Sequence, residues 1–596
     1  MTDSTCPANH GPAKRQAWRR ILIAGLAVLT AACGGGGGGS QTPPTPPTPP
    51  VRLGAPEVAR FLTQASFGPT DAGIEALRDS NFDTWITQQI AAPPPSQSHQ
   101  ATVEAALAAA QAANPSATLN ANNFYYSWWR QAVTEDAQLR QRMAFAYSQI
   151  FVVSLVDTAI SGSSNGIRGA ASYYDMLTRN AFSNYRTLLE EVTLHPAMGV
   201  YLTFLANQRE DAAGTRTPDE NYAREVMQLM SIGLHELNLD GSTRLNAQGQ
   251  PILAYSQQDI SQLAKVFTGI SWYHPTPTNT TFLGGNRNAD SFVRQMIFYP
   301  QYHSFAQKSF LGVTIPARTA ATVTQQTMAD DLRVALDALA NHPNVGPFMA
   351  TRLIQQFVTS NPSPAYVERV ARVFNNNGQG VRGDMGAVIR AVLTDTEARA
   401  TPSGDSFGKL REPVIRITNW ARAFGATSAS GNWLIGNTSS NQTLGQTPLA
   451  SPSVFNFWRP GFTPAGTTLL GTRGLRAPEF QIVDEVSVAG YINTVQTAVA
   501  TGIGVATGGV PDVRSAYGAE VAVADNAEAL VDRMDRLVFY GALPTATRTR
   551  IVEAVNSIAI PSGATVTQAQ IDTARLNRVR TAIQLSLASP DFLIQR

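Results

Sequence analysis

Apolar residues recur at three- and four-residue spacings through most of this 596-residue chain from residue 58 onward. Leu139, Met143, Tyr147 and Ile150 show the pattern, which places apolar side chains on one face of an α-helix. Neither a composition break nor a fixed-period repeat divides the body of the chain. The sequence therefore predicts a mainly α fold, a single large helical domain with a few short β-hairpins and long irregular loops.

Capping residues and prolines mark the helix boundaries. Residues 69–71, Pro-Thr-Asp, predict the start of the second helix, and Ser256 with Asp259 forms the pattern of a capping box. The His195-Pro196 pair predicts a helix end, because proline disfavours helical backbone at the residue before it. The predicted helices cover residues 58–66, 124–153, 173–194, 219–233, 256–267, 329–339, 345–358, 364–375, 385–393, 525–540 and 571–593.

Strand signals are few and local. Residues 244–254, with a turn at 246–250, predict one hairpin, and the alternation of aromatic and polar residues over 292–313 predicts a second. Residues 432–473 are rich in Gly, Ser, Thr, Asn and Pro, which predicts a long irregular loop packed on the body. Because long loops in compact domains often carry function, this segment is a candidate to line a groove.

The first 33 residues resemble the export signal of a bacterial lipoprotein. Lysines and arginines precede an apolar run, residues 21–29, that is too short to span a bilayer. Residues 29–33, Leu-Thr-Ala-Ala-Cys, are similar to a lipobox, which predicts a signal peptide over 1–32 and lipidation of Cys33. Thr30 replaces the usual leucine, so a plain cleavable signal stays an alternative. Paired arginines before the apolar run leave the twin-arginine export route open.

A tether follows the signal. Six glycines (34–39) and Thr-Pro-Pro repeats (42–50) favour flexible and extended backbone, so residues 33–53 are predicted to hold a helical body, 54–596, away from a membrane. The glycine run offers no apolar continuation for a transmembrane anchor. Gly34 follows the cysteine, which by resemblance to enteric lipoprotein sorting favours the outer membrane. The predicted location is the cell envelope, as an outer-membrane lipoprotein or a periplasmic or extracellular protein.

Composition excludes several classes of function. Lys and Arg number 45 against 43 Asp and Glu, without a long basic run after the signal, so nucleic acid is not a predicted partner. The two cysteines are Cys6 and Cys33, and cleavage removes Cys6, which excludes disulfides, thiol catalysis and cysteine metal sites from the body. The histidines lack zinc-ligand spacing, and no phosphate-binding or haem-attachment motif occurs, so no metal or cofactor is predicted.

Segments in order along the chain resemble the motifs of one bacterial family, the domain-of-unknown-function 1800 proteins. The most specific is Pro-Asp-Glu-Asn-Tyr-Ala-Arg-Glu-Val-Met-Gln-Leu at residues 218–229. The resemblance runs from about residue 58 to the end and implies an exported bacterial protein, with a second exported protein resembling alkaline phosphatases or sulfatases as a partner. It supplies no catalytic residues. The other matching segments are Gly233, Asp259, 267–272, Lys308, Gly312, 358–362, 408–413, 451–457, 459–461 and 477–480.

The helix predicted at residues 219–233 carries the strongest candidate for chemistry. Glu220 and Arg224 are four residues apart and share a face, while Glu225 follows on a neighbouring stripe with Asn221. Glu220 and Glu225 are candidates for an acid and a base, with Arg224 setting their pKa values apart, and Asn221 is a candidate to bind substrate. The alternative is structural: a helix capped by Asp219, with a Glu–Arg pair that ties it to its neighbours.

Further candidates lie elsewhere in the chain. His195 is a second candidate base, or else a structural histidine at a helix end. His303 and Lys308 lie among aromatic residues that form either a sugar-binding surface or ordinary packing, and Trp272 is a further candidate to bind substrate. Residues 408–413, Gly-Lys-Leu-Arg-Glu-Pro, predict an internal ion-pair network beside a helix start, with an anion site as the alternative.

Two functional classes remain. The first is a hydrolase or lyase that acts on an extracellular or envelope polymer such as polysaccharide and attaches to a membrane through Cys33. The second is a non-catalytic surface protein that binds polymer or serves a structural role in an envelope assembly. The acidic helix and the long polar loop favour the enzyme, whereas the lack of a recognised catalytic motif favours the second class.

Overall fold

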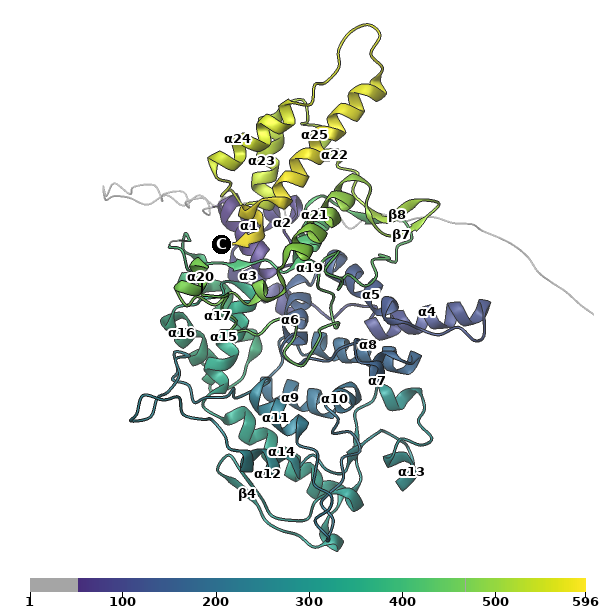
Figure 1. The fold of residues 1–596 in the computed structure, drawn as a ribbon, viewed down its shortest axis with the longest axis vertical. Coiled ribbons are helices and arrows are strands. Elements are labelled where there is room, and N and C mark those ends of the chain that lie inside the picture. Colours follow the sequence, from purple (N-terminus) through teal and green to yellow (C-terminus); the bar gives the residue numbers. More distant parts are fainter. Residues whose placement is uncertain (1–51, 403, 467) are drawn as a thin grey trace, which may run out of the picture. The chain divides into compact units, whose positions relative to one another are not determined.

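The computed structural model of the protein describes residues 52–402, 404–466 and 468–596. Within it, Arg52–Arg596 form one compact unit. The predicted signal peptide, Cys33 and the tether up to residue 51 lie outside the described residues. Arg60 donates a hydrogen bond of 3.0 Å to the backbone oxygen of Arg596, so the two ends of this unit lie side by side (Figure 1).

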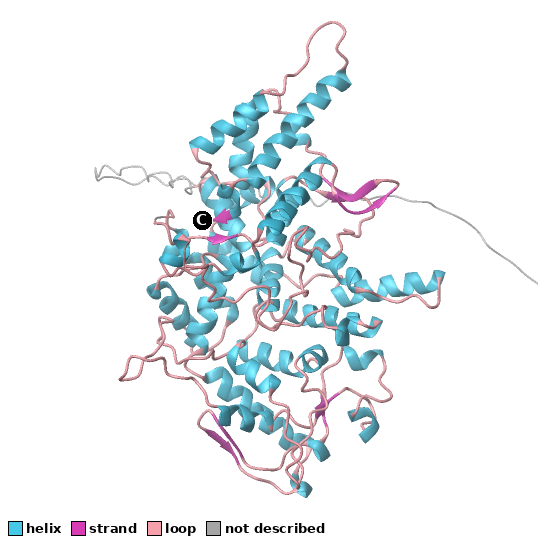
Figure 2. Ribbon diagram, viewed as in Figure 1, coloured by secondary structure: helices cyan, strands magenta, loops and turns pink. Residues whose placement is uncertain are grey.

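The described residues are mainly helical, which confirms the predicted fold class (Figure 2). The first ten helices are α1 (Ala55–Ala65), α2 (Asp71–Arg78), α3 (Phe82–Ala91), α4 (His99–Ala113), α5 (Ala121–Thr134), α6 (Gln138–Ser148), α7 (Thr158–Ser161), α8 (Ser164–Arg179), α9 (Tyr185–Leu194) and α10 (Pro196–Tyr201). The next are α11 (Asn221–Gln228), α12 (Gln257–Ala264), α13 (Asn279–Phe282), α14 (Gln325–Asn341), α15 (Val345–Phe357), α16 (Pro364–Asn375), α17 (Met385–Thr394) and α18 (Thr396–Arg399). The last are α19 (Pro413–Ala423), α20 (Leu469–Thr472), α21 (Glu485–Ala500), α22 (Gly518–Val521), α23 (Ala527–Val538), α24 (Thr545–Asn556), α25 (Gln568–Ala588) and α26 (Pro590–Leu593).

Strands are short, antiparallel and scattered over the unit (Figure 2). Three two-stranded sheets pair β1 (Ile270–Ser271) with β2 (Ile297–Phe298), β3 (Lys308–Phe310) with β4 (Val313–Ile315), and β5 (Lys409–Leu410) with β9 (Ile594–Gln595). In a three-stranded sheet, β8 (Val510–Arg514) lies between β6 (Thr427–Ser428) and β7 (Ile503–Thr507). Four 3-10 helices complete the elements: η1 (Ala289–Phe292), η2 (Pro300–Tyr302), η3 (Ala320–Thr322) and η4 (Pro478–Ile482).

The predicted helix starts follow from side-chain caps. The Thr70 hydroxyl accepts a hydrogen bond of 3.0 Å from the backbone N–H of Gly73 at the start of α2. Ser256 and Asp259 form the predicted capping box at the start of α12. Each cap satisfies backbone N–H groups that the first turn of a helix leaves without an intrahelical acceptor. The sequence therefore located these starts correctly.

Three of the predicted long helices are wrong, because each is two helices in the structure; the helix predicted at 571–593 is divided between α25 and the single turn of α26. The helix predicted at 124–153 is divided between α5 and α6, and the helix predicted at 173–194 between α8 and α9. The side chain of Gln138 donates hydrogen bonds of 3.1 and 2.7 Å to the carbonyls of Ala132 and Glu135, which are left free at the end of α5. Periodicity continues across such a break because both helices face the same core.

One of the two predicted hairpins is corrected. The segment 292–313 does not fold on itself, because β2 pairs back with β1, and the local hairpin is the later one between β3 and β4. The segment 244–254 does turn back on itself at 246–250, with Leu245 opposite Pro251 in an isolated antiparallel bridge. For 292–313, alternation in the sequence indicated extended backbone but not which strand would supply the partner.

The predicted loop at 432–473 is irregular except for the single turn of α20. It is packed on the body through the buried side chains of Trp433, Leu444 and Leu449. The backbone oxygen of Leu449 accepts a hydrogen bond of 2.6 Å from the N–H of Leu155, which joins the loop to the segment after α6. Among residues 52–596 as described, no helix is long and apolar enough to cross a membrane.

Candidate functional site

The predicted acidic helix is present as α11 but is shorter than residues 219–233. Glu220, rather than Asp219, occupies the N-cap position and makes no cap hydrogen bond with its side chain. Asp219 lies one residue earlier, and its carboxylate accepts a hydrogen bond of 2.8 Å from the N–H of Asn221. The sequence thus identified Asp219 as a residue whose side chain accepts a hydrogen bond from the start of the helix, but it placed the N-cap position one residue too early.

The two glutamates of α11 lie in different environments. Glu220 is partly exposed, pairs with Arg224 at 3.4 Å and accepts a hydrogen bond of 2.7 Å from the side chain of Gln257. Glu225 is buried, and its Oε2 has no hydrogen-bond partner among the described residues. Burial raises the pKa of Glu225, against the opposing charge of Arg224. Asn221 is partly exposed, and neither glutamate lines either of the two cavities described below.

His195 is both the C-cap of α9 and the N-cap of α10. Its Nδ1 accepts a hydrogen bond of 3.2 Å from the N–H of Ala197, and its ring packs edge-on against Tyr173. Burial lowers the pKa of His195 to about 3, and Arg179 acts in the same direction, so the ring is neutral at pH 7. These contacts are those of a structural cap.

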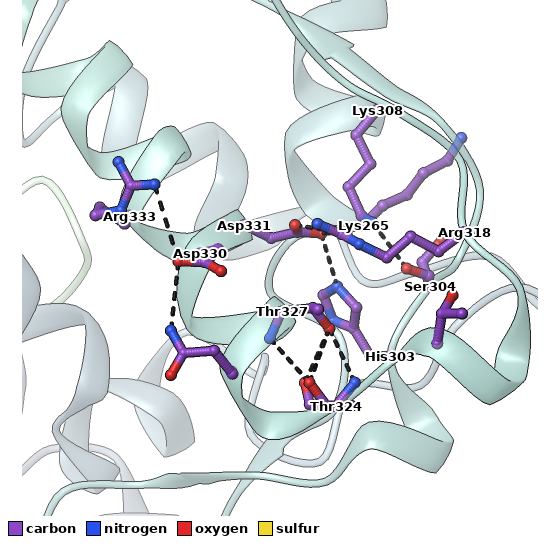
Figure 3. A network of polar contacts seen from close by, with 12 residues as sticks. Lys265, His303, Ser304, Lys308, Arg318, Thr324, Thr327, Asp330, Asp331 and Arg333 are labelled. Atoms are coloured by element: carbon purple, nitrogen blue, oxygen red, sulfur yellow. Dashed lines mark hydrogen bonds and ion pairs between the residues drawn. The ribbon is translucent and has the colours of Figure 1, made fainter.

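His303 and Lys308 belong to a buried network centred on Asp331 of α14 (Figure 3). The Asp331 carboxylate lies 3.2 Å from Nε2 of His303, 3.0 Å from Nζ of Lys308 and 2.6 Å from Nη1 of Arg318. His303, Lys308 and Asp331 are each about 1 % exposed or less. Trp272 is also buried, against the ring of Phe292. The structure therefore packs these predicted substrate-binding residues inside the body.

A second group of charged residues forms where residues 408–413 meet η4. Lys409 lies on β5, Glu412 is the N-cap of α19 just before Pro413, and Glu479 lies on η4. The Lys409 ammonium is 3.0 Å from Oε1 of Glu479 and 3.8 Å from Oε1 of Glu412. None of the three side chains is more than 3 % exposed, so this is a buried ion triad. The internal ion-pair network predicted for residues 408–413 is confirmed.

Amide side chains from distant segments complete this group. Oε2 of Glu412 accepts hydrogen bonds of 2.9 Å from Gln149 and 2.8 Å from Gln446. Gln446 is itself oriented by the N–H of Val414, in the first turn of α19. The side-chain oxygen of Gln149 accepts a hydrogen bond of 2.9 Å from the amide of Asn456. We call Lys409, Glu412, Glu479, Gln149 and Gln446 the carboxylate cluster.

A small cavity of about 50 Å³, lined by both apolar and polar side chains, adjoins the carboxylate cluster. Such a volume holds one or two water molecules or a single polar group. Asn456, one of its lining residues, has a φ of +65°, a left-handed conformation that asparagine adopts more readily than most residues. Its polar lining residues are Gln149, Arg352, Gln355, Gln356, Asn456 and Glu479, together with Trp458.

The two carboxylates of the cluster have different environments. Glu412 accepts two amide hydrogen bonds through one oxygen, Oε2. Burial raises the pKa of Glu479, against the charge of Lys409, while the nearby Glu412 raises it further. The second oxygen of Glu479, Oε2, has no hydrogen-bond partner among the described residues. Two buried carboxyl groups in different surroundings are an arrangement that general acid–base catalysis uses.

Sequence reasoning missed Glu479 as a candidate, although it had marked residues 477–480 as one of the segments that resemble a family. Five of those segments, 218–229, 408–413, 451–457, 459–461 and 477–480, contribute residues to the carboxylate cluster or its cavity. The spacing along the chain carries no sign of the contact, since Gln149 and Glu412 are 263 residues apart. The described residues contain no group of three or more His, Cys, Asp or Glu side chains that could hold a metal ion.

Comparison with known families agrees with the resemblance. Residues 60–594 match the family described as "Protein of unknown function (DUF1800)". The chain belongs to this family. The match spans nearly all of the described body, including both α11 and the carboxylate cluster. No curated protein and no solved structure matches this DUF1800 chain. Membership of the family brings no activity with it, so function is argued from the site.

Proposed function

We propose that this DUF1800 protein is a hydrolase or lyase that acts on an extracellular or envelope polymer such as polysaccharide. The observation that carries the proposal is the buried pair Glu412 and Glu479, held on one Lys409 ammonium, with Glu479 lining a small cavity that also presents amide side chains. Two oxygens at these distances from one nitrogen are less than about 7 Å apart, an upper limit that admits the roughly 5 to 5.5 Å between the carboxyl groups of retaining glycosidases. Amide and tryptophan side chains are also the usual partners of sugar hydroxyls and ring faces.

The roles follow from the two environments. Glu479, whose pKa is raised by burial, has a free Oε2 that acts, when protonated, as the general acid on the leaving oxygen. Glu412, whose Oε2 is held by hydrogen bonds from Gln149 and Gln446, acts as the base on a water molecule in a hydrolase or on a carbon-bound proton in a lyase. The cavity admits one polar group, so the polymer itself would lie at its mouth, beside the loop at 454–460.

The proposal includes where the protein is located and how it is attached to the membrane. Lipidation of Cys33 would anchor the chain in the cell envelope, and the tether up to residue 53 would let the body reach a polymer. The partner implied by the resemblance, an exported protein similar to alkaline phosphatases or sulfatases, would then act on the same material. The alternative, a non-catalytic surface protein of an envelope assembly, requires the same anchor but no acid–base pair.

A substrate screen with matched variants tests the proposal. Wild type, Glu479→Gln and Glu412→Gln would be assayed against a panel of polysaccharides, with Glu220→Gln and Glu225→Gln as the competing pair on α11. We expect wild type to cleave at least one polymer and the two cluster variants to lose about 10²- to 10⁴-fold in kcat. The α11 variants should keep the activity.

Two results would count against the proposal, and one control is needed. Activity that survives Glu479→Gln but not Glu225→Gln would assign catalysis to α11. A wild type that binds a polymer of the panel without cleaving it would favour the non-catalytic alternative. The cluster variants could lose activity only because they unfold. In that case the urea concentration at their unfolding midpoints will fall together with the activity, so unfolding curves are measured on the same samples.

A further inference from the structure

An apolar cavity lies on the other side of Glu479. It has a volume of about 380 Å³, within the range of small-molecule binding sites, and lies between η4, α21 and the segment around α26. Glu479 lines both this cavity and the small cavity beside the carboxylate cluster, so it lies between them. The apolar lining residues are Leu410, Pro413, Leu444, Phe480, Ile482, Val483, Val488, Tyr491, Ile492, Ala588, Pro590, Leu593 and Ile594.

One end of this cavity carries a positive charge. Arg416 lines it, is 6 % exposed, and lies with its guanidinium 4.7 Å from the centre of the Tyr491 ring. Its Nε donates a hydrogen bond of 2.7 Å to the carbonyl of Arg411, and within residues 52–596 as described no carboxylate forms an ion pair with it. The charges of Glu479 and Glu412 act on Arg416 and raise its pKa against the larger effect of burial, which lowers it, but neither carboxylate forms an ion pair with Arg416.

The neighbouring residue Arg411 does not line the cavity, but it adds a second buried cation whose charge acts on Arg416. Its side chain is 1 % exposed, and its three guanidinium nitrogens have no hydrogen-bond partner among the described residues. It is stabilised by the ring of Phe592, whose centre lies 4.4 Å away. A buried cation without a counter-charge is unfavourable, so an anion at this end of the cavity would stabilise the folded chain.

The mouth of the cavity is apolar. Val483 is 39 % exposed and Val488 is 52 % exposed, and both line the cavity. Val486, on the same helix as Val488, is similarly exposed at 46 % but does not line it. A ligand that enters here meets hydrocarbon at the mouth and a cation inside, so its own apolar part must lie along the walls and its charge must be negative.

We propose that this cavity binds an unbranched aliphatic carboxylate, with the carboxylate on Arg416 and the hydrocarbon chain against α21 and the segment around α26. The geometry carries the assignment: an apolar space of a few hundred Å³, one unpaired arginine and a hydrocarbon-lined opening. Arginine matches a carboxylate through two parallel N–H donors. This binding does not depend on the proposed catalytic activity and can be measured without a substrate.

Calorimetric titration of the full chain with dodecanoate tests the proposal. We expect saturable binding at one site, with decanoate, two methylenes shorter, about fifteenfold weaker. Dodecanol, which lacks the charge, and dodecyltrimethylammonium, which reverses it, should bind at least about tenfold more weakly than dodecanoate. An equal affinity for dodecanol would overturn the assignment of an anion site.

Two variants on α21 locate the ligand. Val488→Trp fills the mouth of the cavity and should weaken dodecanoate binding at least about tenfold, whereas Val486→Trp, at an equally exposed valine outside the cavity, should leave it unchanged. Arg416→Met should weaken dodecanoate but not dodecanol; if this variant fails to fold, the valine pair still decides the site. Equal binding by both valine variants, or no saturable binding by wild type, would overturn the proposal.

Discussion

Replacing Asp331 by asparagine tests whether the network of Figure 3 holds the fold together. Asp331 is 1 % exposed and contacts three cationic or basic side chains, Lys308, His303 and Arg318. Burial alone raises the pKa of this carboxyl group. The hydrogen bond from His303 and the charge of Lys308 more than offset burial, so the pKa of Asp331 falls to about 2. Asparagine keeps the shape of the side chain and removes the charge.

The magnitude follows from these contacts. A pKa that falls from 3.8 to about 2 corresponds to roughly 2 kcal/mol of stability above the unfolded pKa. The substitution also leaves the fully buried ammonium of Lys308 without its carboxylate, and breaking a buried pair in this way costs about 3 to 5 kcal/mol. We therefore expect Asp331→Asn to lower the free energy of unfolding by about 3 to 5 kcal/mol at pH 7.

Asp330, the preceding residue on α14, provides the control. It is 46 % exposed, and its nearest cation is Arg333 at 3.9 Å, so Asp330→Asn should change stability by less than about 0.5 kcal/mol. Urea unfolding followed by tryptophan fluorescence measures both variants against wild type. If Asp331→Asn proves as mild as Asp330→Asn, the argument from burial is wrong.

The pH dependence gives a second check on the same variant. The pKa of Asp331 is lower in the folded state than in the unfolded state. The stabilisation by its ionised carboxylate is therefore complete above about pH 4 and is lost as the pH falls through about 2. The difference in stability between wild type and Asp331→Asn should accordingly narrow over this window. A difference that stays constant from pH 5 to pH 2 would refute the assigned pKa shift.

Further predictions concern Asp175 and one glycine. Burial raises the pKa of Asp175 to about 6, although its carboxylate caps the start of α4, so its contribution to stability is greatest below about pH 4 and is lost as the pH rises through 6. Between pH 4 and pH 7, this effect should change the free energy of unfolding of wild type by about 2 to 3 kcal/mol, and Asp175→Asn should remove that change. Urea unfolding at the two pH values measures it. If the free energy of unfolding of Asp175→Asn depends on pH as strongly as that of wild type, the assigned pKa shift is wrong. Gly269 has a φ of +73°, and a Cβ there would lie 2.9 Å from the backbone N of His303 and O of Tyr299. Gly269→Ala should therefore lower the free energy of unfolding by more than about 2 kcal/mol. Gly249 has a similar φ of +74° but open space around it, so Gly249→Ala should cost only about 1 kcal/mol. Equal melting temperatures for the two variants would show that the close contact at Gly269 relaxes.

Much of the helical content of this protein could be predicted from its sequence. The helix predicted at residues 364–375 matches α16, and the box of Ser256 and Asp259 is where the pattern placed it. The breaks within the long predicted helices were missed. The Gln138 side chain donates hydrogen bonds to the free carbonyls at the end of α5, and the spacing of apolar residues does not indicate such a contact. Strand pairing was missed for a related reason: β1 and β2 are brought together by the fold around them.

The candidate site was predicted less well than the fold. The acidic helix drew attention because Glu220, Arg224 and Glu225 are neighbours in sequence, and local spacing can be read directly. Glu479 and Gln149 could not be read in this way, because each becomes part of a site only through contacts with residues far away in the chain. Burial, which raises the pKa of Glu479, is likewise a property of the packed chain.

The sequence by itself determined that this body is helical and that its core must be built without disulfides, because helical periodicity and the absence of cysteine are local facts. It also carried the predicted lipidation of Cys33 and the motifs that mark the family. Only the tertiary structure decided which polar residues lose contact with water and which cations face them. Desolvation depends on every element packed around a group, so Lys409, Glu412 and Glu479 became a site, and Arg416 an unpaired cation, only when the chain had folded.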